Sequence, residues 1–166
     1  MNAFGWGIAP PFTLAPPLDP GAGIRESILA ALQANAGLRR IFGTRIFCRF
    51  IPEDAALPAL VLNLVSDTPD RNLSGPDGTR DARILIKAVS KDPSDSVSAM
   101  EYVRQSLEGL INVTLTFPVG RSVKALWVML EDEGDEVEDA ADGTAEPIQP
   151  TTAPYKIRYR DPIPRS

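Results

Sequence analysis

Residues 38–70 read LRRIFGTRIFCRFIPEDAALPALVLNLVSDTPD, and the fold is decided in this stretch. Gly43 separates a short apolar helical turn from residues 45–50, whose isoleucine and phenylalanine side chains favour a strand. Pro52 is expected to end that strand. The almost continuous apolar run over residues 59–66 then predicts a second strand, buried on both faces.

Amphipathic helices are predicted on both sides of these strands. The first opens at Pro20 and carries apolar residues at helical spacing, and Gly37 is expected to end it. The second helix can be capped by Asp92 or by Ser94. Its apolar stripe is expected to comprise Val97, Met100, Val103, Leu107, Leu110 and Ile111.

The rest of the chain predicts further strands. A polar loop over residues 67–79 precedes residues 80–89, where apolar and polar side chains alternate as in a half-buried strand. Three more strands are predicted over residues 112–117, 123–130 and 155–159.

This order of elements predicts an α+β fold, in which two helices pack on an antiparallel-rich sheet of about five to six strands. The chain has 166 residues, so we expect a single domain over residues 21–166. One core between helices and sheet is predicted to contain Ile28, Leu32, Leu62, Leu64, Ile84, Ile86, Val103 and Leu107.

Residues 1–20 differ from the rest of the chain because they combine five prolines with large apolar side chains. The prolines favour extended backbone and exclude a helical signal peptide. One interpretation is a disordered leader, or residues that pack on the chain's own body. The other is an extended arm that lies on a neighbouring subunit, because exposed apolar groups usually mark contacts. The interface residues of that arm would be Phe4, Trp6, Ile8, Phe12 and Leu14.

The formal charge of -5 arises from one segment. Residues 131–146 carry nine acidic side chains and no basic one, whereas the rest of the chain has 13 acidic and 17 basic residues. We expect an acidic loop over about residues 131–152. Such a run of like charges repels itself and is expected to be extended unless a partner orders it. Its candidate contact residues are Glu133, Asp135, Glu136, Glu138 and Asp139.

Basic side chains form two small groups in the sequence. Arg39, Arg40 and Arg45 lie near the end of the first helical region, and Lys156, Arg158 and Arg160 share one face of the last predicted strand. Both groups fit a solvated surface. The alternative is a face that meets an acidic protein or passing DNA, without sequence recognition.

Composition excludes most enzyme classes. There is no histidine and only one cysteine, so histidine-dependent catalytic triads, histidine-bound zinc and intramolecular disulfides are ruled out. Residues 70–81 match a calcium loop only in part, and turn formation explains them better. No apolar run approaches the ~20 residues that cross a bilayer. We therefore expect no catalytic residue, metal, cofactor or membrane contact.

The stretch from residue 24 to residue 111 resembles a known family. The order RIF, P, ALP, VL and VSDTP, followed by the helix SAMEYVRQSLEGL, is similar to the tail-completion, or tail-terminator, proteins of long-tailed bacteriophages and gene-transfer particles. The proline-rich arm and the acidic loop lie outside that pattern.

This resemblance implies a structural protein of the virion neck, made in the bacterial cytoplasm. It implies a homo-oligomer, a hexameric ring that ends the tail tube and contacts both the tail tube protein and the head-completion (stopper) protein, with DNA passing through. In such a ring, the acidic loop would either face the channel and repel DNA phosphates, or meet a basic partner ring, which we prefer. The alternatives are another small virion connector, such as a head-completion or tail-tube subunit, and a carboxylate-dependent metal-binding enzyme.

Overall fold

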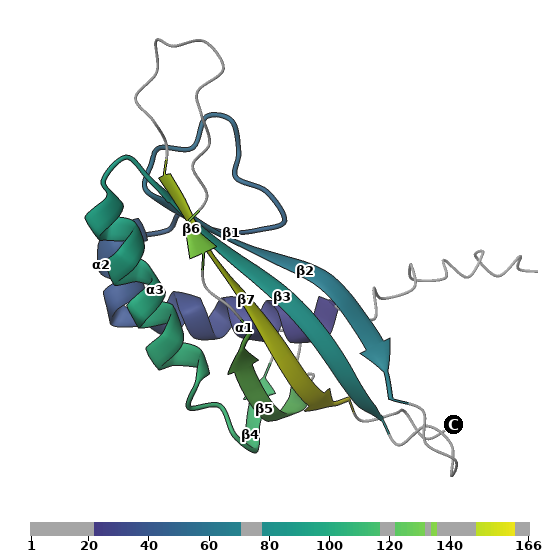
Figure 1. Ribbon diagram of the computed structural model, residues 1–166. Helices are drawn as coiled ribbons and strands as arrows, with labels where there is room; N and C mark the ends of the chain where they lie inside the picture. The colour runs from purple at the N-terminus through teal and green to yellow at the C-terminus, as the bar shows by residue number, and fades with distance from the viewer. Residues whose placement is uncertain (1–21, 71–77, 117–121, 132–133, 136–148, 162–166) are drawn as a thin grey trace, which may run out of the picture.

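The computed structural model describes residues 22–70, 78–116, 122–131, 134–135 and 149–161 (Figure 1). Its helices are α1 (Ala22–Ala34), α2 (Ala36–Phe42) and α3 (Pro93–Leu107). Its strands are β1 (Ile46–Cys48), β2 (Ala59–Pro69), β3 (Thr79–Ser90), β4 (Val113–Thr116), β5 (Ser122–Leu130), β6 (Gly134–Asp135) and β7 (Gln149–Arg160).

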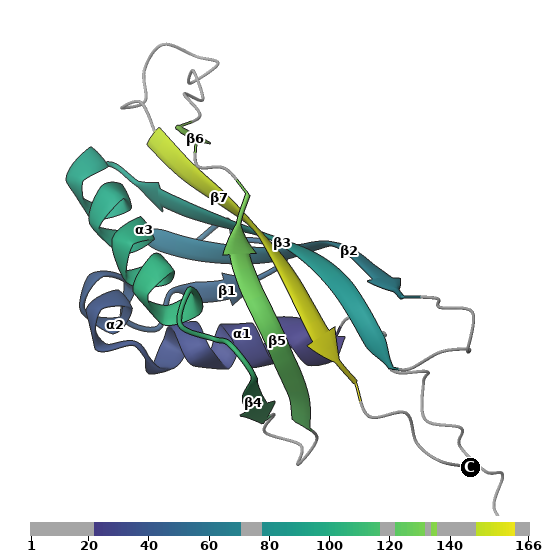
Figure 2. The ribbon, with the colours of Figure 1, turned by 60° about the horizontal axis from the view of Figure 1, so that its bottom comes forward.

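The strands form one twisted sheet in the order β1-β2-β3-β7-β5-β4, and β6 pairs with β7 beyond the end of β5. Only β1 and β2 are parallel among these pairs. The helices lie together against one face of the sheet, and no described helix covers the other face (Figures 1 and 2). The predicted α+β class and the antiparallel-rich sheet are therefore confirmed.

The core lies between the helices and the sheet. All eight predicted core residues belong to it: Leu64 is partly buried at its margin and the other seven are inaccessible to solvent. The alternation in β3 is also confirmed, because Ala82, Ile84, Ile86 and Ala88 all face this core. Period-two and helical spacing thus identified the buried faces correctly.

The prediction that Gly37 ends the first helix is wrong. α1 ends at Ala34, and Asn35 caps α2 by accepting a 3.1 Å hydrogen bond from the backbone N–H of Leu38. Gly37 lies in the first turn of α2, where a Cβ atom would lie 2.5 Å from the ring of Tyr102 on α3. The glycine is there because the two helices approach closely, not because the chain must turn.

The capping prediction for α3 is confirmed for Asp92, whose carboxylate accepts a 2.9 Å hydrogen bond from the N–H of Ser94. Two members of the predicted stripe are wrong, since Val97 and Ile111 are each 63% exposed. The buried face runs instead through Ser96, Ala99, Met100, Val103 and Leu107. Val97 lies one residue off that face, and Ile111 follows the end of the helix.

β7 begins at Gln149, six residues before the predicted start of the last strand at Tyr155. The strand contains Pro150 and Pro154, although proline donates no ladder hydrogen bond. Pro154 is tolerated at the junction between β6 and β5, where its carbonyl accepts a 2.9 Å hydrogen bond from the N–H of Glu131. Residues 149–152 therefore belong to the sheet rather than to the acidic loop.

Candidate partner-binding surfaces

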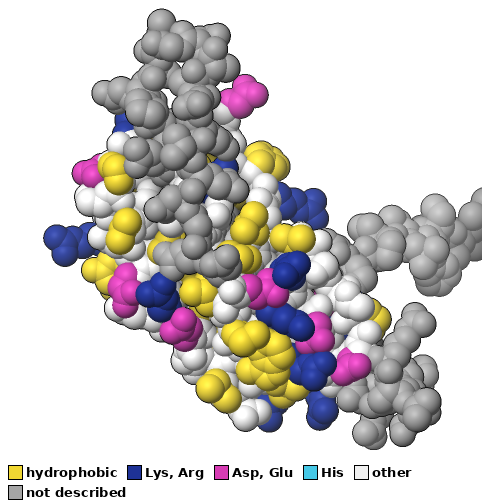
Figure 3. All heavy atoms as spheres, in the orientation of Figure 1, with side chains coloured by type: hydrophobic (Ala, Val, Ile, Leu, Met, Phe, Trp, Pro, Cys, Tyr) yellow, Lys and Arg dark blue, Asp and Glu magenta, His cyan; other side chains and the backbone are white. Residues whose placement is uncertain are grey.

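The sheet face opposite the helices, called here the open face, carries the outward side chains of β2, β3, β7 and β5. On β3 and β7 these side chains alternate with buried ones, so Asp81 and Arg83 lie beside Arg158 and Lys156 in register. Charged side chains of both signs gather on this face (Figure 3). On β3 and β7, the open face therefore carries charged side chains, and the opposite face of these strands contributes to the core.

Arg83 and Glu131 form a two-point ion pair across β7. Nε of Arg83 lies 2.6 Å from Oε2 of Glu131, and Nη2 lies 2.9 Å from Oε1. The hydrogen bond from Arg83 lowers the pKa of Glu131 and raises the pKa of Arg83 itself. Because the backbone N–H of Glu131 also bonds to Pro154, the chain that leaves β5 is held on the sheet at this point.

Arg158 is shared between two carboxylates. Its Nε lies 2.9 Å from Oδ1 of Asp81, and its Nη2 lies 3.1 Å from Oδ2 of Asp70. Both aspartates belong to the segment that partly matches a calcium loop. Their bonds to Arg158 account for them without a metal ion.

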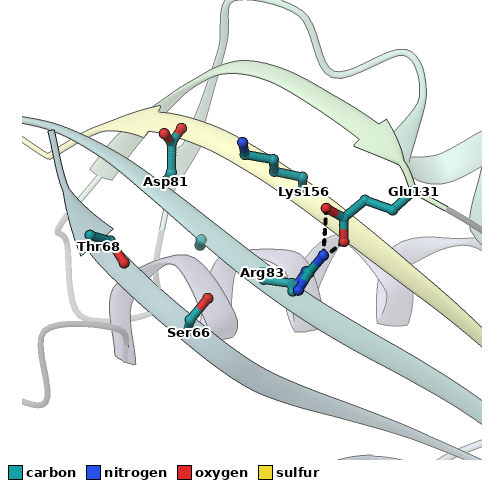
Figure 4. A pocket seen from close by; sticks show the side chains of 7 residues that line it. Ser66, Thr68, Asp81, Arg83, Glu131 and Lys156 are labelled. Atoms are coloured by element: carbon teal, nitrogen blue, oxygen red, sulfur yellow. Dashed lines mark hydrogen bonds and ion pairs between the residues drawn. The ribbon is translucent and has the colours of Figure 1, made fainter.

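Asp81, Arg83 and Glu131 border a depression of about 320 Å³ that opens to solvent (Figure 4). Its carboxylates, Asp81 and Glu131, are each paired with an arginine, so neither is a free acid or base. Within the described residues, no three acidic or cysteine side chains gather where they could hold a metal ion. The depression is lined by Ser66, Thr68, Asp81, Ala82, Arg83, Glu131 and Lys156.

The structure separates the predicted basic residues. Arg39 and Arg40 are exposed at the end of α2, on the helix side of the sheet. Arg45 is partly buried, and its Nε donates a 2.8 Å hydrogen bond to the carbonyl of Pro58. Arg45 therefore supports the chain before β2, and the first basic group does not join the second into one surface.

The second basic group does lie on the open face. The ammonium group of Lys156 lies 5.9 Å from the ring centre of Trp127, within cation–π range. Arg160 lies opposite Lys124 of β5, and both side chains are exposed. Neither forms an ion pair with a carboxylate of the described residues.

Sequence reasoning missed Lys124, Trp127 and Met129, which extend this surface onto β5. Their outward positions depend on a register shift between Ala125 and Trp127, which places Leu126 out of the simple alternation. Met129 is 52% exposed. The sequence offered one signal, a lysine and a tryptophan within the predicted strand at residues 123–130. That this strand pairs with β7 is known only from the structure.

The other predicted interface residues are not placed. Phe4, Trp6, Ile8, Phe12, Leu14, Glu133, Glu136, Glu138 and Asp139 lie outside the described residues. For Asp135 the structure gives only the backbone, which pairs with Thr151 in the β6–β7 ladder. Among the described helices, none combines the length and apolar character that crossing a membrane requires.

The chain matches one protein family model, and its fold is similar to that of a solved structure. The model of the family described as "Tail completion protein gp17" matches residues 26–123. A chain in the solved structure "Virion of native gene transfer agent (GTA) particle" is similar in fold, with a TM-score of 0.64 and 14% sequence identity. That alignment covers 83% of this chain and 95% of the other. No curated protein sequence matches. Because the family match spans more than half of the chain, this protein belongs to the tail completion protein gp17 family and is a structural protein of a phage-like virion tail.

Proposed function

We propose that this protein forms a hexameric ring that ends the tail tube and joins the tail to the head-completion proteins. The observation that carries the proposal is the family match over residues 26–123, which begins within α1 and reaches the start of β5. The matched region thus contains the helices and most of the core. The partners would be further copies of the chain, the tail tube protein and the head-completion protein.

DNA would pass through the ring without being read. On the open face, Arg83 and Arg158 are both paired with carboxylates, so these two arginines carry no unpaired charge for phosphate contacts. We propose that the acidic segment, residues 131–146, faces a protein partner rather than the channel.

The N-terminal twenty residues would be a second contact. They lie outside the described residues, and the proposal is supported by their composition, five large apolar side chains among five prolines. A backbone restricted by proline loses less entropy on docking. We propose that this arm lies on a neighbouring chain.

The role we propose involves no catalysis. The two carboxylates of the depression, Asp81 and Glu131, pair with Arg158 and Arg83 at 2.9 and 2.6 Å. A carboxylate-dependent enzyme would need at least one acid poised to exchange a proton near neutral pH. Solution mass with and without a chelator separates the two ideas, since a ring would form regardless of metal.

Position in the particle tests the proposal directly. Electron microscopy of particles that carry a label fused to the chain should show density only between head and tail. Particles made without the chain should show tails that are unattached and variable in length. A label along the tube would identify a tail-tube subunit, and a label on detached heads a head-completion protein. Either result would overturn the proposed role.

A further inference from the structure

We propose that the exposed end of the open face binds the acidic segment of a second copy of this chain. This inference rests on the proposed ring and names one of its contacts. The basic patch consists of Lys124, Trp127, Lys156 and Arg160, which lie on the adjacent strands β5 and β7. The proposed occupant is residues 131–146 of the neighbouring chain.

Charge complementarity supports this occupant. The acidic segment carries nine carboxylates and no basic side chain. Lys124 and Arg160 have no ion-pair partner among the described carboxylates. Lys156 lies over the ring of Trp127, and its charge interacts with Glu131, whose carboxylate is paired with Arg83. Trp127 and Met129 add apolar surface beside these cations, which is the composition of a protein-binding patch.

Of the chain's own acidic segment, Glu131 lies near this patch, where it pairs with Arg83 and interacts electrostatically with Lys156. The part that follows Asp135 is too short to reach Arg160 at the far end of the patch. Asp135 pairs with Thr151, and Arg160 lies nine residues farther along β7, or about 30 Å. Only residues 136–148 connect β6 to β7, so their midpoint extends at most about 24 Å from the ladder. The chain also leaves β6 in the direction away from Arg160, since β6 runs antiparallel to β7.

A contact between copies follows from this polarity. β6, within the acidic segment, pairs near the start of β7, whereas Lys124 and Arg160 of the basic patch lie opposite each other at its end. Figure 1 shows β6 beside the first half of β7. Such head-to-tail contacts are heterologous, and they close into a ring when the rotation between copies permits. In that ring, the strands would run from one neighbour towards the next rather than parallel to the central axis.

Fluorescence provides a direct test. The chain has two tryptophans, so Trp6→Phe leaves Trp127 as the only reporter. We would titrate this full-length variant with a synthetic peptide of residues 131–146. We expect saturable change in Trp127 emission, with affinity falling at least about fivefold between roughly 20 and 200 mM salt. A peptide in which Asn or Gln replaces all nine acids should produce no saturable change.

Charge reversal supplies matched variants. Lys124→Glu with Arg160→Glu should weaken peptide binding at least about tenfold. Arg49→Glu with Lys91→Glu makes the same change in charge at two exposed positions outside the patch and should retain the affinity. All four side chains are exposed, and circular dichroism would verify the fold. Absence of saturation, or equal weakening by both pairs, would overturn the inference.

Cross-linking tests the contact in the particle. A carbodiimide would join carboxylates to nearby lysines in particles assembled from equal amounts of ¹⁴N and ¹⁵N chains. We expect mixed-isotope peptides that link residues 131–146 to Lys124 or Lys156. Links only within one chain, or only to another protein, would refute this contact. A ring seen at the neck without these links would leave the proposed function intact, so the two failures are distinguishable.

Discussion

The hydroxyl of Tyr159 donates a 2.9 Å hydrogen bond to Oδ2 of Asp67, which connects β7 to β2 across β3. Asp67 also accepts from Nε of Arg80 at 2.9 Å, and its side chain is only 6% exposed. Burial, reinforced by the nearby carboxylate, raises the pKa of Tyr159 well above its usual value. The buried carboxylate of Asp67 therefore has hydrogen-bond partners on both β3 and β7.

Tyr159→Phe should destabilise the fold by about 1.5–3 kcal/mol, because it removes a hydrogen bond to a charged and buried acceptor. Urea unfolding at neutral pH would measure the loss. Tyr102→Phe is the matched control, since that hydroxyl forms no hydrogen bond with another described residue, and it should change stability by less than about 0.5 kcal/mol. Equal losses would show that the Asp67 contact contributes nothing.

The exposed Arg83–Glu131 pair predicts a dependence on pH. Because Arg83 lowers the pKa of Glu131 in the folded chain, the pair stabilises the fold above the unfolded pKa, and this contribution is lost as pH falls through the folded value. Arg83→Gln should raise the pKa of Glu131 towards its usual value, as measured by NMR titration of side-chain carboxyl carbons. Arg104→Gln, on α3, should leave that titration unchanged.

Close packing at Gly37 predicts the sign of another substitution. Alanine usually favours a helix over glycine by about 0.5–1 kcal/mol. At this position, three ring atoms of Tyr102 would lie 2.5–2.6 Å from the new methyl group, so we expect Gly37→Ala to lose about 1–3 kcal/mol overall. Gly109→Ala meets no atom within 4 Å and is the control. Stabilisation by Gly37→Ala in thermal melts would show that Tyr102 moves aside freely.

Asp67 illustrates what the sequence could and could not predict. Periodicity predicted the buried faces, because which face of a strand or helix is buried depends on the spacing of apolar residues within that element. The second strand was expected to end at Ser66, since a charged residue rarely continues a buried strand. β2 in fact continues to Pro69, because Arg80 and Tyr159 satisfy the carboxylate of Asp67. Those partners lie 13 and 92 residues away, so only the folded register reveals them.

The same limit applies to the open face. Lys156, Arg158 and Arg160 were predicted to share a face, and the structure places them on one side of β7. Their environments depend on contacts with other strands, such as Asp81 at a separation of 77 residues. The register shift in β5 that positions Trp127 leaves no pattern in the sequence.

The core and surface of α3 should respond differently to truncation. Leu107 is fully buried, and Leu107→Ala should lose about 2–5 kcal/mol through lost burial and a cavity. Val97 was expected to lie on the same stripe but is 63% exposed, so Val97→Ala should change stability by less than about 0.5 kcal/mol. Denaturant melts of both variants would measure the difference. A loss below about 1 kcal/mol for Leu107→Ala would contradict the packing of this helix.

Deletion of residues 1–20 should impair assembly while leaving the domain folded. α1 begins at Ala22, and Ile24, Ile28 and Leu32 are fully buried in a core that the described residues form among themselves. The deletion should therefore preserve the unfolding midpoint. It would remove five large apolar side chains from the proposed contact between copies, so the yield of joined particles should fall. Replacing the same five side chains with serine, while keeping the prolines, is the matched variant that separates side-chain contacts from arm length. Normal yields of joined particles from both variants would eliminate the arm as an assembly contact.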